Sequence, residues 1–557
     1  MASPKPILPR STNAIWKSRD ELKLPPSHSK SILLTNGRIH PRADSADSVG
    51  AVLVADGRVI GYGAQTELAR FDPAPGETIE LAGRTVLPGL IDAHLHFEQY
   101  ARRLSRVDCE LPSLADCLKR IQERAARAGP GEWIQGHGWN QYLWGGFGTA
   151  EELDRAAPNH PAYLTAKSLH AAWVNSRALD LANIDSSTPD PPDGAIHRGP
   201  DGSPTGILFE GAMRMVSDLL SRPTPIQLGE TLAAAQDRLL SVGLTGIHDF
   251  DGPSCLEALQ LLREAGRLDL RVVKNLPVEV LEHLRATGLH TGFGDDWIRL
   301  GNIKVFADGA LGPRTAAMLD PYEGEPENRG MLLVDREGLT EIALRAADGG
   351  LAMTVHAIGD RATHEVLESF TMLRSHEAAH KLPHLRHRIE HLQLLHPDDL
   401  GRAGALHLVA SMQPIHATSD MPMADQYWGD RVRTSYAWRT ELEAGATLAF
   451  GSDAPVEDPN PFLGIHAAVT RRRVDGSPGQ AGWIPEQRLT LEQALAAYTI
   501  GPAYAASMET VQGRLEPGYL ADLIVLDRDP YECQPEELAE LAPVGTMVGG
   551  QWRYRIF

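Results

Sequence analysis

The clearest chemical signal in the chain is a set of histidines and one aspartate placed where short apolar runs end. In a β-strand alternate side chains share a face, so His94 and His96 point the same way and can bind one cation. The pair alone is weak evidence, because the chain has 22 histidines. Three further apolar runs end in one metal-compatible residue each, namely His356, His391 and Asp453. Each residue singly fits a structural role better, but their conjunction on several strand ends favours a metal site.

Lys304 adds a second kind of chemistry, because it lies inside the apolar run 302–306. A buried ammonium group is costly unless it is paired or loses its proton. Asp308 is a candidate partner for it. A neutral lysine amine could instead take up CO₂ and become a carbamate whose two oxygens bridge two metal ions. The residues alone leave both interpretations open.

Short apolar strands that alternate with Ala- and Leu-rich helical segments would position these side chains. Such alternation predicts a parallel sheet covered by helices, and catalytic residues of a (β/α)₈ barrel come from the carboxyl ends of several strands. Nine segments qualify for eight places, and we expect the surplus one among the second to fourth. They are 86–93, 162–166, 245–248, 271–274, 299–306, 352–356, 386–391, 407–412 and 447–450.

The chain ends have a different texture, with short β runs separated by turn residues such as Asn36-Gly37 and Asp56-Gly57. We therefore predict an α/β protein with a (β/α)₈ barrel over residues 88–504. Residues 31–87 and 505–557 would pair into a small β-sandwich domain, although two separate β appendages are the alternative. An inserted substrate lobe is expected within about 98–240, after the first barrel strand, and residues 1–30 would form a loosely docked arm.

Composition limits the partners of a chain of 557 residues. With 53 basic against 73 acidic residues, the net charge of −20 disfavours binding to nucleic acid or to an anionic membrane surface. Four scattered cysteines suit a reducing compartment, and no apolar leader or membrane span is evident. We expect a cytoplasmic protein with a small-molecule substrate, and a homodimer is one candidate assembly state.

The order His-x-His, Lys, His, His, Asp on successive strands resembles the metal-dependent amidohydrolase superfamily. Three longer strings resemble its amidohydrolase-3 branch, which includes N-substituted formamide deformylases: 170–176 (HAAWVNS), 306–316 (FADGALGPRTA) and 356–362 (HAIGDRA). The resemblance runs from about Leu33 to Asp527 and includes the closing stretch 513–526. It is specific for the superfamily and branch and poorly specific for the substrate.

The resemblance implies a binuclear centre with two divalent ions. His94 and His96 would hold one ion and His356 and His391 the other, while Lys304, as a CO₂-derived carbamate, would bridge them. Asp453 would ligate the first ion. Zinc is expected, with manganese, iron, cobalt or nickel as alternatives. A metal-bridging hydroxide would attack the substrate carbonyl, with Asp453 as general base and then acid.

Aromatic residues in the insertion and after the seventh strand predict a largely apolar pocket. The expected substrate contacts are Trp139, His170, Trp173, Arg314, Met412 and Trp428, while Pro313 and Asn140 depart from the family pattern. We predict hydrolysis of a C–N bond in an N-acyl or N-formyl amide of a hydrophobic amine. The alternatives are a cyclic amide hydrolase or heterocycle deaminase at the same centre, and a non-catalytic scaffold with this fold.

Overall fold

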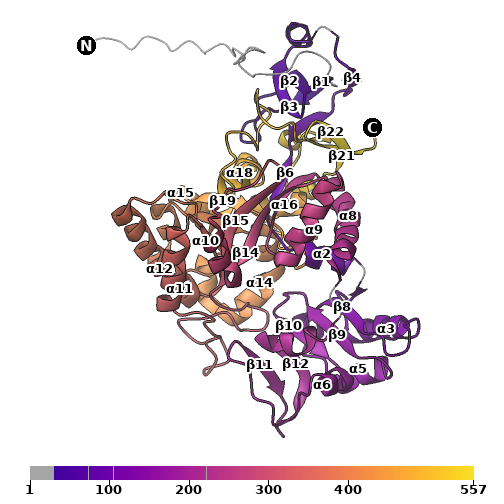
Figure 1. Ribbon diagram of the computed structural model, residues 1–557, viewed down its shortest axis with the longest axis vertical. Helices are drawn as coiled ribbons and strands as arrows, with labels where there is room; N and C mark the ends of the chain where they lie inside the picture. The colour runs from indigo at the N-terminus through magenta and orange to yellow at the C-terminus, as the bar shows by residue number, and fades with distance from the viewer. Residues whose placement is uncertain (1–30, 73, 105, 221–222) are drawn as a thin grey trace.

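The computed structural model describes residues 31–557 except 73, 105, 221 and 222, so the predicted arm over residues 1–30 lies outside the described part. Three sheets follow one another along the long axis of the molecule (Figure 1). A sheet built from both chain ends lies at one end, the helix-covered barrel occupies the middle, and the inserted lobe forms the other end.

The middle sheet contains eight parallel strands, as predicted. Its hydrogen-bonded order runs from the last of these strands in the chain, Thr447–Phe450, back to the first, Leu90–Leu95. Hydrogen bonds from Asp453 N to His94 O (2.7 Å) and from His96 N to Ala454 O (2.9 Å) join the two outer strands at one edge. The strands are β6 (Leu90–Leu95), β13 (Leu244–Asp249), β14 (Arg271–Pro277), β15 (Ile298–Phe306), β16 (Met353–Ala357), β17 (Arg388–His391), β18 (Val409–Met412) and β19 (Thr447–Phe450).

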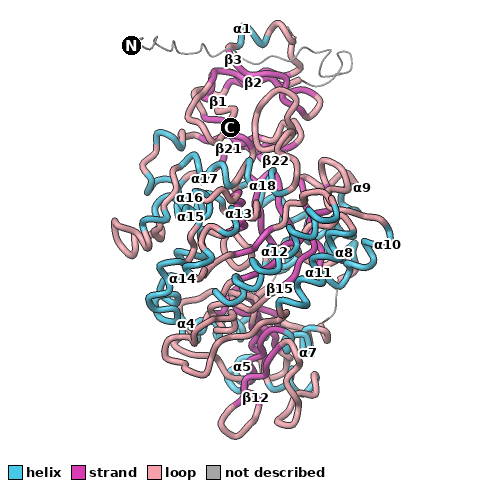
Figure 2. Tube along the Cα trace, turned by 90° about the vertical axis from the view of Figure 1, so that its left-hand side faces the viewer, coloured by secondary structure: helices cyan, strands magenta, loops and turns pink. Residues whose placement is uncertain are grey.

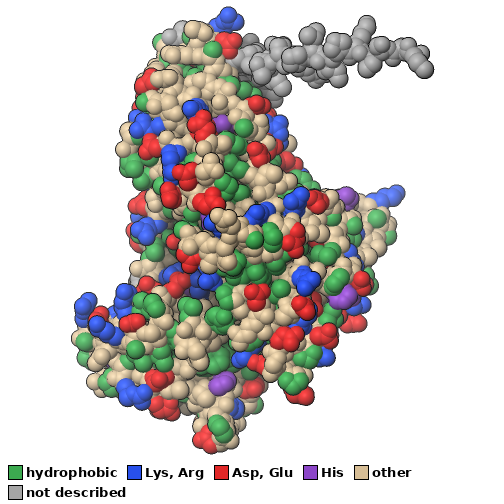
Figure 3. Space-filling model, turned by 180° about the vertical axis from the view of Figure 1, so that it is seen from behind, with side chains coloured by type: hydrophobic (Ala, Val, Ile, Leu, Met, Phe, Trp, Pro, Cys, Tyr) green, Lys and Arg blue, Asp and Glu red, His purple; other side chains and the backbone are tan. Residues whose placement is uncertain are grey.

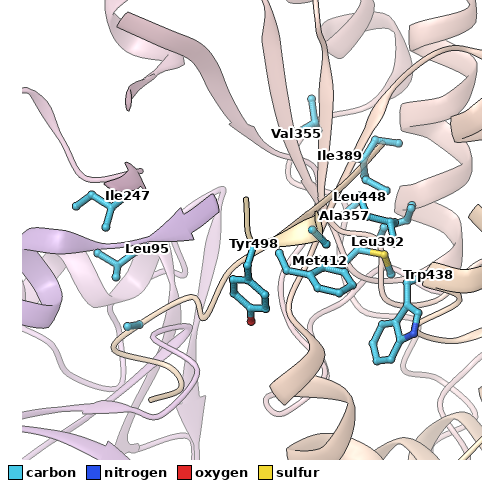
Figure 4. Packing of buried hydrophobic residues seen from close by; sticks show 14 of the residues in the cluster. Leu95, Ile247, Val355, Ala357, Ile389, Leu392, Met412, Trp438, Leu448 and Tyr498 are labelled. Atoms are coloured by element: carbon cyan, nitrogen blue, oxygen red, sulfur yellow. The ribbon is translucent and has the colours of Figure 1, made fainter. Parts of the chain in front are cut away.

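Helices surround the barrel strands, as the view from the side shows (Figure 2). In α8 (Pro225–Ser241), the hydroxyl of Thr224 caps the first turn and buried side chains recur at helical spacing: Leu228, Leu232, Ala235 and Leu239. Figure 4 shows apolar side chains of neighbouring strands, among them Val355 and Ile389, in the same buried cluster. The other principal helices are α9 (Pro253–Glu264), α11 (Arg336–Asp348), α12 (Asp360–His380), α14 (Pro414–Trp428) and α16 (Pro461–Thr470).

Two of the nine predicted strand segments need comment. The surplus segment is 162–166, which forms β9 (Ala162–Ala166) in the inserted lobe and lies within the predicted range. The segment 86–93 is not one strand, because β5 (Thr85–Pro88) belongs to the end sheet and β6 to the barrel. Gly89 separates them, and a Cβ there would lie 2.3 Å from the hydroxyl of Thr245 in β13, so the close approach of this link to β13 requires glycine.

The two chain ends share a sheet, as predicted. β20 (Leu523–Leu526) pairs antiparallel with β5, which joins the C-terminal strands to the N-terminal ones. All strands of this sheet except β4, which pairs with β1, follow one continuous hydrogen-bonded path, and side chains from both ends share a buried cluster. The other strands are β1 (Ile32–Ile39), β2 (Val49–Ala55), β3 (Arg58–Gly63), β4 (Glu77–Glu80), β21 (Pro543–Val548) and β22 (Gln551–Arg555).

The inserted lobe is a six-stranded sheet with its own cores, placed after the first barrel strand as predicted. Its strands run in the order β11 (Gly194–Arg198), β12 (Pro204–Glu210), β10 (Ala171–Val174), β9, β8 (Ile134–Trp139) and β7 (Val107–Asp108). The helices α3 (Leu114–Ala125), α5 (Ala150–Ala156) and α6 (Ser176–Leu181) belong to this lobe.

The surface carries both signs of charge. On the face in Figure 3, acidic and basic side chains are interspersed, with hydrophobic side chains scattered between them. Among the described residues, no helix has the length and apolar character that crossing a membrane would require.

Candidate metal centre

The predicted ligands converge at the carboxyl-terminal edge of the barrel strands. Asp453 Oδ1 lies 3.4 Å from His94 Nε2 and 3.5 Å from His96 Nε2. The ring centroid of His391 is 4.9 Å from that of His94 and 4.5 Å from that of His356. The tightest group is formed by His94, His391 and Asp453, whose potential ligand atoms all lie within 4.8 Å of one another.

Backbone geometry at two strand ends turns side chains toward this centre. His391 has φ 70° and Asp453 has φ 58°, both in the left-handed region that non-glycine residues seldom adopt. Gly451 precedes Asp453 where β19 meets β6, and a Cβ there would lie 2.4 Å from the backbone nitrogen of His94. The close contact between these two strands therefore brings Asp453 beside the His-x-His pair.

Lys304 is buried in the centre without a hydrogen-bonding partner among the described residues. Its Nζ lies 4.8 Å from the ring centroid of Phe250 and 4.7 Å from that of Phe306. Asp308 does not pair with it, because this carboxylate accepts hydrogen bonds from the backbone N–H groups of residues 317, 358 and 359. Burial lowers the pKa of Lys304 to about 8, so a neutral amine is accessible near neutral pH.

The donor set fits divalent metal ions. Burial lowers the pKa of His94 to about 4 and that of His356 and His391 well below the ordinary value, so these imidazoles are neutral and keep a lone pair. The buried Nε2 atom of His94, like Nζ of Lys304, has no hydrogen-bonding partner among the described residues. Unpaired buried nitrogens are costly, and a cation between them and Asp453 would remove that cost.

A second set of residues orients the imidazoles. Glu390 Oε2 accepts from His94 Nδ1 at 2.6 Å, Asp251 Oδ1 lies 3.3 Å from His96 Nδ1, and Gln413 Oε1 lies 2.9 Å from His391 Nδ1. Partners of this kind fix the ring orientation and raise the basicity of the other ring nitrogen.

Sequence reasoning missed these orienting residues. In a regular strand, Glu390 would lie on the face opposite its neighbour His391, and the sequence therefore does not mark it as part of the site. The side chain of Glu390 points into the barrel, where it contacts His94. The left-handed backbone of His391 directs the His391 side chain to the same centre. Asp251 and Gln413 follow predicted strands by one to three positions, so the strand-end signal that marked His356 could also have found them.

A chain of charges connects Asp453 to the cavity wall. His416 Nε2 lies 3.2 Å from Asp453 Oδ2, its Nδ1 lies 3.7 Å from Glu457, and Glu457 is 3.1 Å from Lys167 Nζ. Burial opposes a charged His416, but its hydrogen bond to Asp453 and the nearby carboxylate of Glu457 raise its pKa to about 10. The wall beside Asp453 is therefore built from paired charges.

The centre opens into a cavity of about 350 Å³ between the barrel and the inserted lobe. This volume is in the range of small-molecule sites. Among the predicted substrate contacts, Trp139 and His170 line it. His170 Nδ1 lies 2.9 Å from Glu210, and its ring centroid is 5.3 Å from that of His356.

Four predicted substrate contacts are not among the residues that line this cavity. Trp173 is buried in the inserted lobe, where its indole N–H donates to Thr149 O. Met412 and Trp428 lie in the barrel core, and Arg314 pairs with Glu325. Large apolar side chains near a site can either contact the substrate or pack in the protein core, and the sequence pattern does not distinguish these two roles.

The cavity lining is mixed, not largely apolar as predicted. Apolar walls come from residues such as Tyr142, Leu143, Leu311, Ile358, Met423 and Val456. Charged side chains also reach the cavity, namely Lys167, Asp420, Glu457 and Arg473. Their scattered positions along the chain carry no motif, which is why composition and spacing did not reveal them.

Comparison with known proteins agrees with this geometry. The model of an amidohydrolase family matches residues 77–554. The chain is 32% identical to Protein LONG AFTER FAR-RED 3 of Arabidopsis thaliana, covering 98% of this chain and 95% of that protein. It is 29% identical to an N-substituted formamide deformylase of Arthrobacter pascens, over 94% of this chain and 98% of that enzyme.

A solved structure has the same architecture. An uncharacterised metal-dependent hydrolase from Pyrococcus horikoshii OT3 superposes with a TM-score of 0.74 at 29% identity, covering 91% of this chain and 99% of that one. The family match spans most of the chain and includes every strand of the barrel. The chain therefore belongs to the amidohydrolase family.

Proposed function

We propose that the protein hydrolyses the C–N bond of an amide, an N-acyl or N-formyl derivative of an amine with an apolar part. One observation carries this proposal: the expected histidine and aspartate ligands lie together at one barrel edge, and two buried nitrogens, His94 Nε2 and Lys304 Nζ, have no hydrogen-bonding partner in the described chain. Such a site combines metal ligands with an adjoining cavity of substrate size.

In this proposal His94, His96, His356 and His391 would hold the divalent ions. Lys304, once carboxylated by CO₂, would add carbamate oxygens to the donor set, and its lowered pKa favours that reaction because the free amine is the nucleophile. Divalent ions, of which zinc suits imidazole and carboxylate ligands best, supply Lewis acidity that activates water and polarises a carbonyl.

Asp453 is the residue proposed to move the proton. Although burial alone would raise the pKa of its carboxyl group, the hydrogen bond from the charged His416 opposes this and lowers it, so Asp453 is ionised. The side chain also lines the cavity. The carboxylate can therefore take a proton from water and deliver it to the leaving nitrogen, as base and then acid.

The substrate class rests on two supports. Apolar cavity walls suit the hydrocarbon part of an amine, and one relative is named N-substituted formamide deformylase. Cyclic amides and heterocyclic amines would meet the same donor set, so they belong in the same substrate panel. A non-catalytic role also needs a direct test, because another relative carries the name LONG AFTER FAR-RED 3.

Metal analysis and a substrate panel test the proposal together. We expect about two ions per chain by mass spectrometry, and release of amine from N-formyl or N-acyl amines faster than from cyclic ureas. Protein without metal would contradict the proposed centre. If the metal-loaded protein is inactive on every substrate of the panel, the result would favour a non-catalytic protein with this fold.

The bridging role of Lys304 has a separate test. Lys304→Ala should lose metal and at least about 100-fold of the activity, because removing one strong ligand costs several kcal/mol. A short carboxylic acid such as propionate should restore part of both. Full metal content and full activity in this variant would exclude a ligand role for Lys304.

A further inference from the structure

Arg473 is a cavity-lining cation that the proposed chemistry does not use. It follows α16, beyond the residues of the metal centre. Its Nε donates to Thr418 O at 2.8 Å and its Nη2 donates to Ser419 O at 3.0 Å. Its Nη1 makes no hydrogen bond to any described residue.

The reason for this placement lies in α14. Pro422 is inside that helix, and proline has no backbone N–H to donate to the carbonyl four residues earlier. That carbonyl belongs to Thr418, and the guanidinium of Arg473 satisfies it. Since Pro422 itself lines the cavity, the interruption of the helix fixes Arg473 at the cavity wall.

The charge of Arg473 is not neutralised by a carboxylate within 4.0 Å among the described residues. Lys167, the other strong cation of the lining, differs in this respect, because Glu110 and Glu457 lie 2.8 and 3.1 Å from its Nζ. Asp475, two positions after Arg473, accepts hydrogen bonds from Ser477 and interacts with the charge of Arg473 only from beyond 4.0 Å.

Asp420 is an acidic residue that also lines this cavity, and its charge would oppose the binding of an anion. Burial raises its pKa, and the hydroxyl of Tyr436 donates to its Oδ2 at 2.7 Å. One oxygen of this carboxyl group is therefore already occupied by Tyr436. Lys167 and His416 are paired with carboxylates, so the positive charge on this wall without such a partner among the described residues is that of Arg473.

We propose that Arg473 binds a carboxylate on the amine portion of the substrate, so that the protein acts on N-acyl or N-formyl amino acids. The proposal rests on the proposed amide hydrolysis. A guanidinium offers several N–H groups in one plane and suits a carboxylate. The apolar walls around Tyr142, Leu311 and Met423 would then receive the amino-acid side chain.

The test compares two amides that differ by one carboxylate, N-formyl-L-phenylalanine and N-formyl-2-phenylethylamine. The measured quantity is the ratio of their kcat/KM values, acid over neutral. The wild-type ratio should exceed about 10, because a charge-assisted hydrogen bond contributes that factor or more. A wild-type ratio of one or less would overturn the proposal without any variant.

The variant Arg473→Gln should lower this ratio about 10- to 100-fold. A merely structural role of Arg473 would lower both kcat/KM values alike and leave the ratio unchanged, which would also overturn the proposal. Arg472→Gln is the matched control, because Arg472 carries the same charge next in sequence but pairs with Glu536 at 2.8 Å. Its ratio should equal that of the wild type.

Failure of the proposed hydrolysis is distinguishable from failure of this inference. If the wild-type protein cleaves neither amide, the hydrolytic proposal fails for this pair. Calorimetric binding of N-formyl-L-phenylalanine to the protein as purified then remains decisive. Binding about 10- to 100-fold weaker in Arg473→Gln supports the carboxylate subsite, and equal binding in both proteins contradicts it.

Discussion

Glu390→Gln tests how the barrel prepares His94 for a metal ion. Glu390 and His94 are both fully buried, and Glu390 Oε2 accepts from His94 Nδ1 at 2.6 Å. The other carboxylate oxygen lies 2.8 Å from Arg388 Nε. An amide of the same shape keeps one acceptor, but it loses the negative charge and adds N–H groups beside a guanidinium.

The expected magnitude follows from these contacts. A hydrogen bond to a charged group contributes about 1.5–3 kcal/mol, and each 1.4 kcal/mol corresponds to about a factor of 10. Weakening this bond makes the Nε2 lone pair of His94 less basic and its ring orientation less fixed. We therefore expect metal affinity to fall about 10- to 100-fold, with activity restored in part by excess metal.

The assay is competition with a chromogenic chelator, followed by metal analysis and kcat/KM at low and high metal concentration. Glu377→Gln is the matched control, because Glu377 Oε1 accepts from the buried His387 at 2.8 Å away from the metal centre. It should lower the melting temperature without changing metal affinity. Wild-type metal affinity and kcat/KM in Glu390→Gln would refute the orienting role.

Three further predictions address packing, titration and metal removal. Gly451→Ala places a Cβ 2.4 Å from the nitrogen of His94, so we expect a destabilisation of about 1–3 kcal/mol and at least tenfold lower activity. A soluble variant with wild-type melting temperature and kcat/KM would contradict the close contact. Burial raises the pKa of Glu441 from 4.5 to about 7, so the folded protein holds this proton more tightly than the unfolded chain. Its contribution to stability is present below about pH 4.5 and is lost as the pH rises to about 7, by up to about 3 kcal/mol. Melting curves of Glu441→Gln at pH 5.5 and 8 should show a smaller pH dependence than those of the wild type, and an unchanged dependence would show that this carboxyl group does not titrate as described. Removing metal with a chelator should lower the melting temperature reversibly, because the buried nitrogens of the centre lose their ligand, and no change on adding metal back would speak against a bound ion.

The barrel could be predicted because its strands leave local signals. Apolar runs of strand length recur between helical segments, and each of the later runs from 245 to 450 became a barrel strand. The surplus segment could not be assigned from its own residues. Ala162–Ala166 is as apolar and as buried as a barrel strand, and only its pairing with β8 and β10 places it in the inserted lobe.

The substrate side of the site was less predictable, for a physical reason. Trp139 and Trp173 are both tryptophans on strands of the inserted lobe, and both are buried. Trp139 also lines the cavity, whereas Trp173 packs over Gly148 inside the lobe. The way the lobe packs on the barrel decides which face of its sheet meets the cavity. The residues next to Trp139 or Trp173 in the sequence do not determine this packing.

The residue types of the candidate centre and their order on the strands could be predicted from the sequence, because alternation and strand-end position are local properties of a chain. What surrounds these residues depends on the folded barrel. Closure of β6 against β19 places Asp453 beside His94, the left-handed backbone of His391 lets it share the centre with Glu390, and an interrupted helix fixes Arg473 at the cavity wall. These contacts join residues far apart in the chain, and their energies depend on burial that exists only once the barrel has formed.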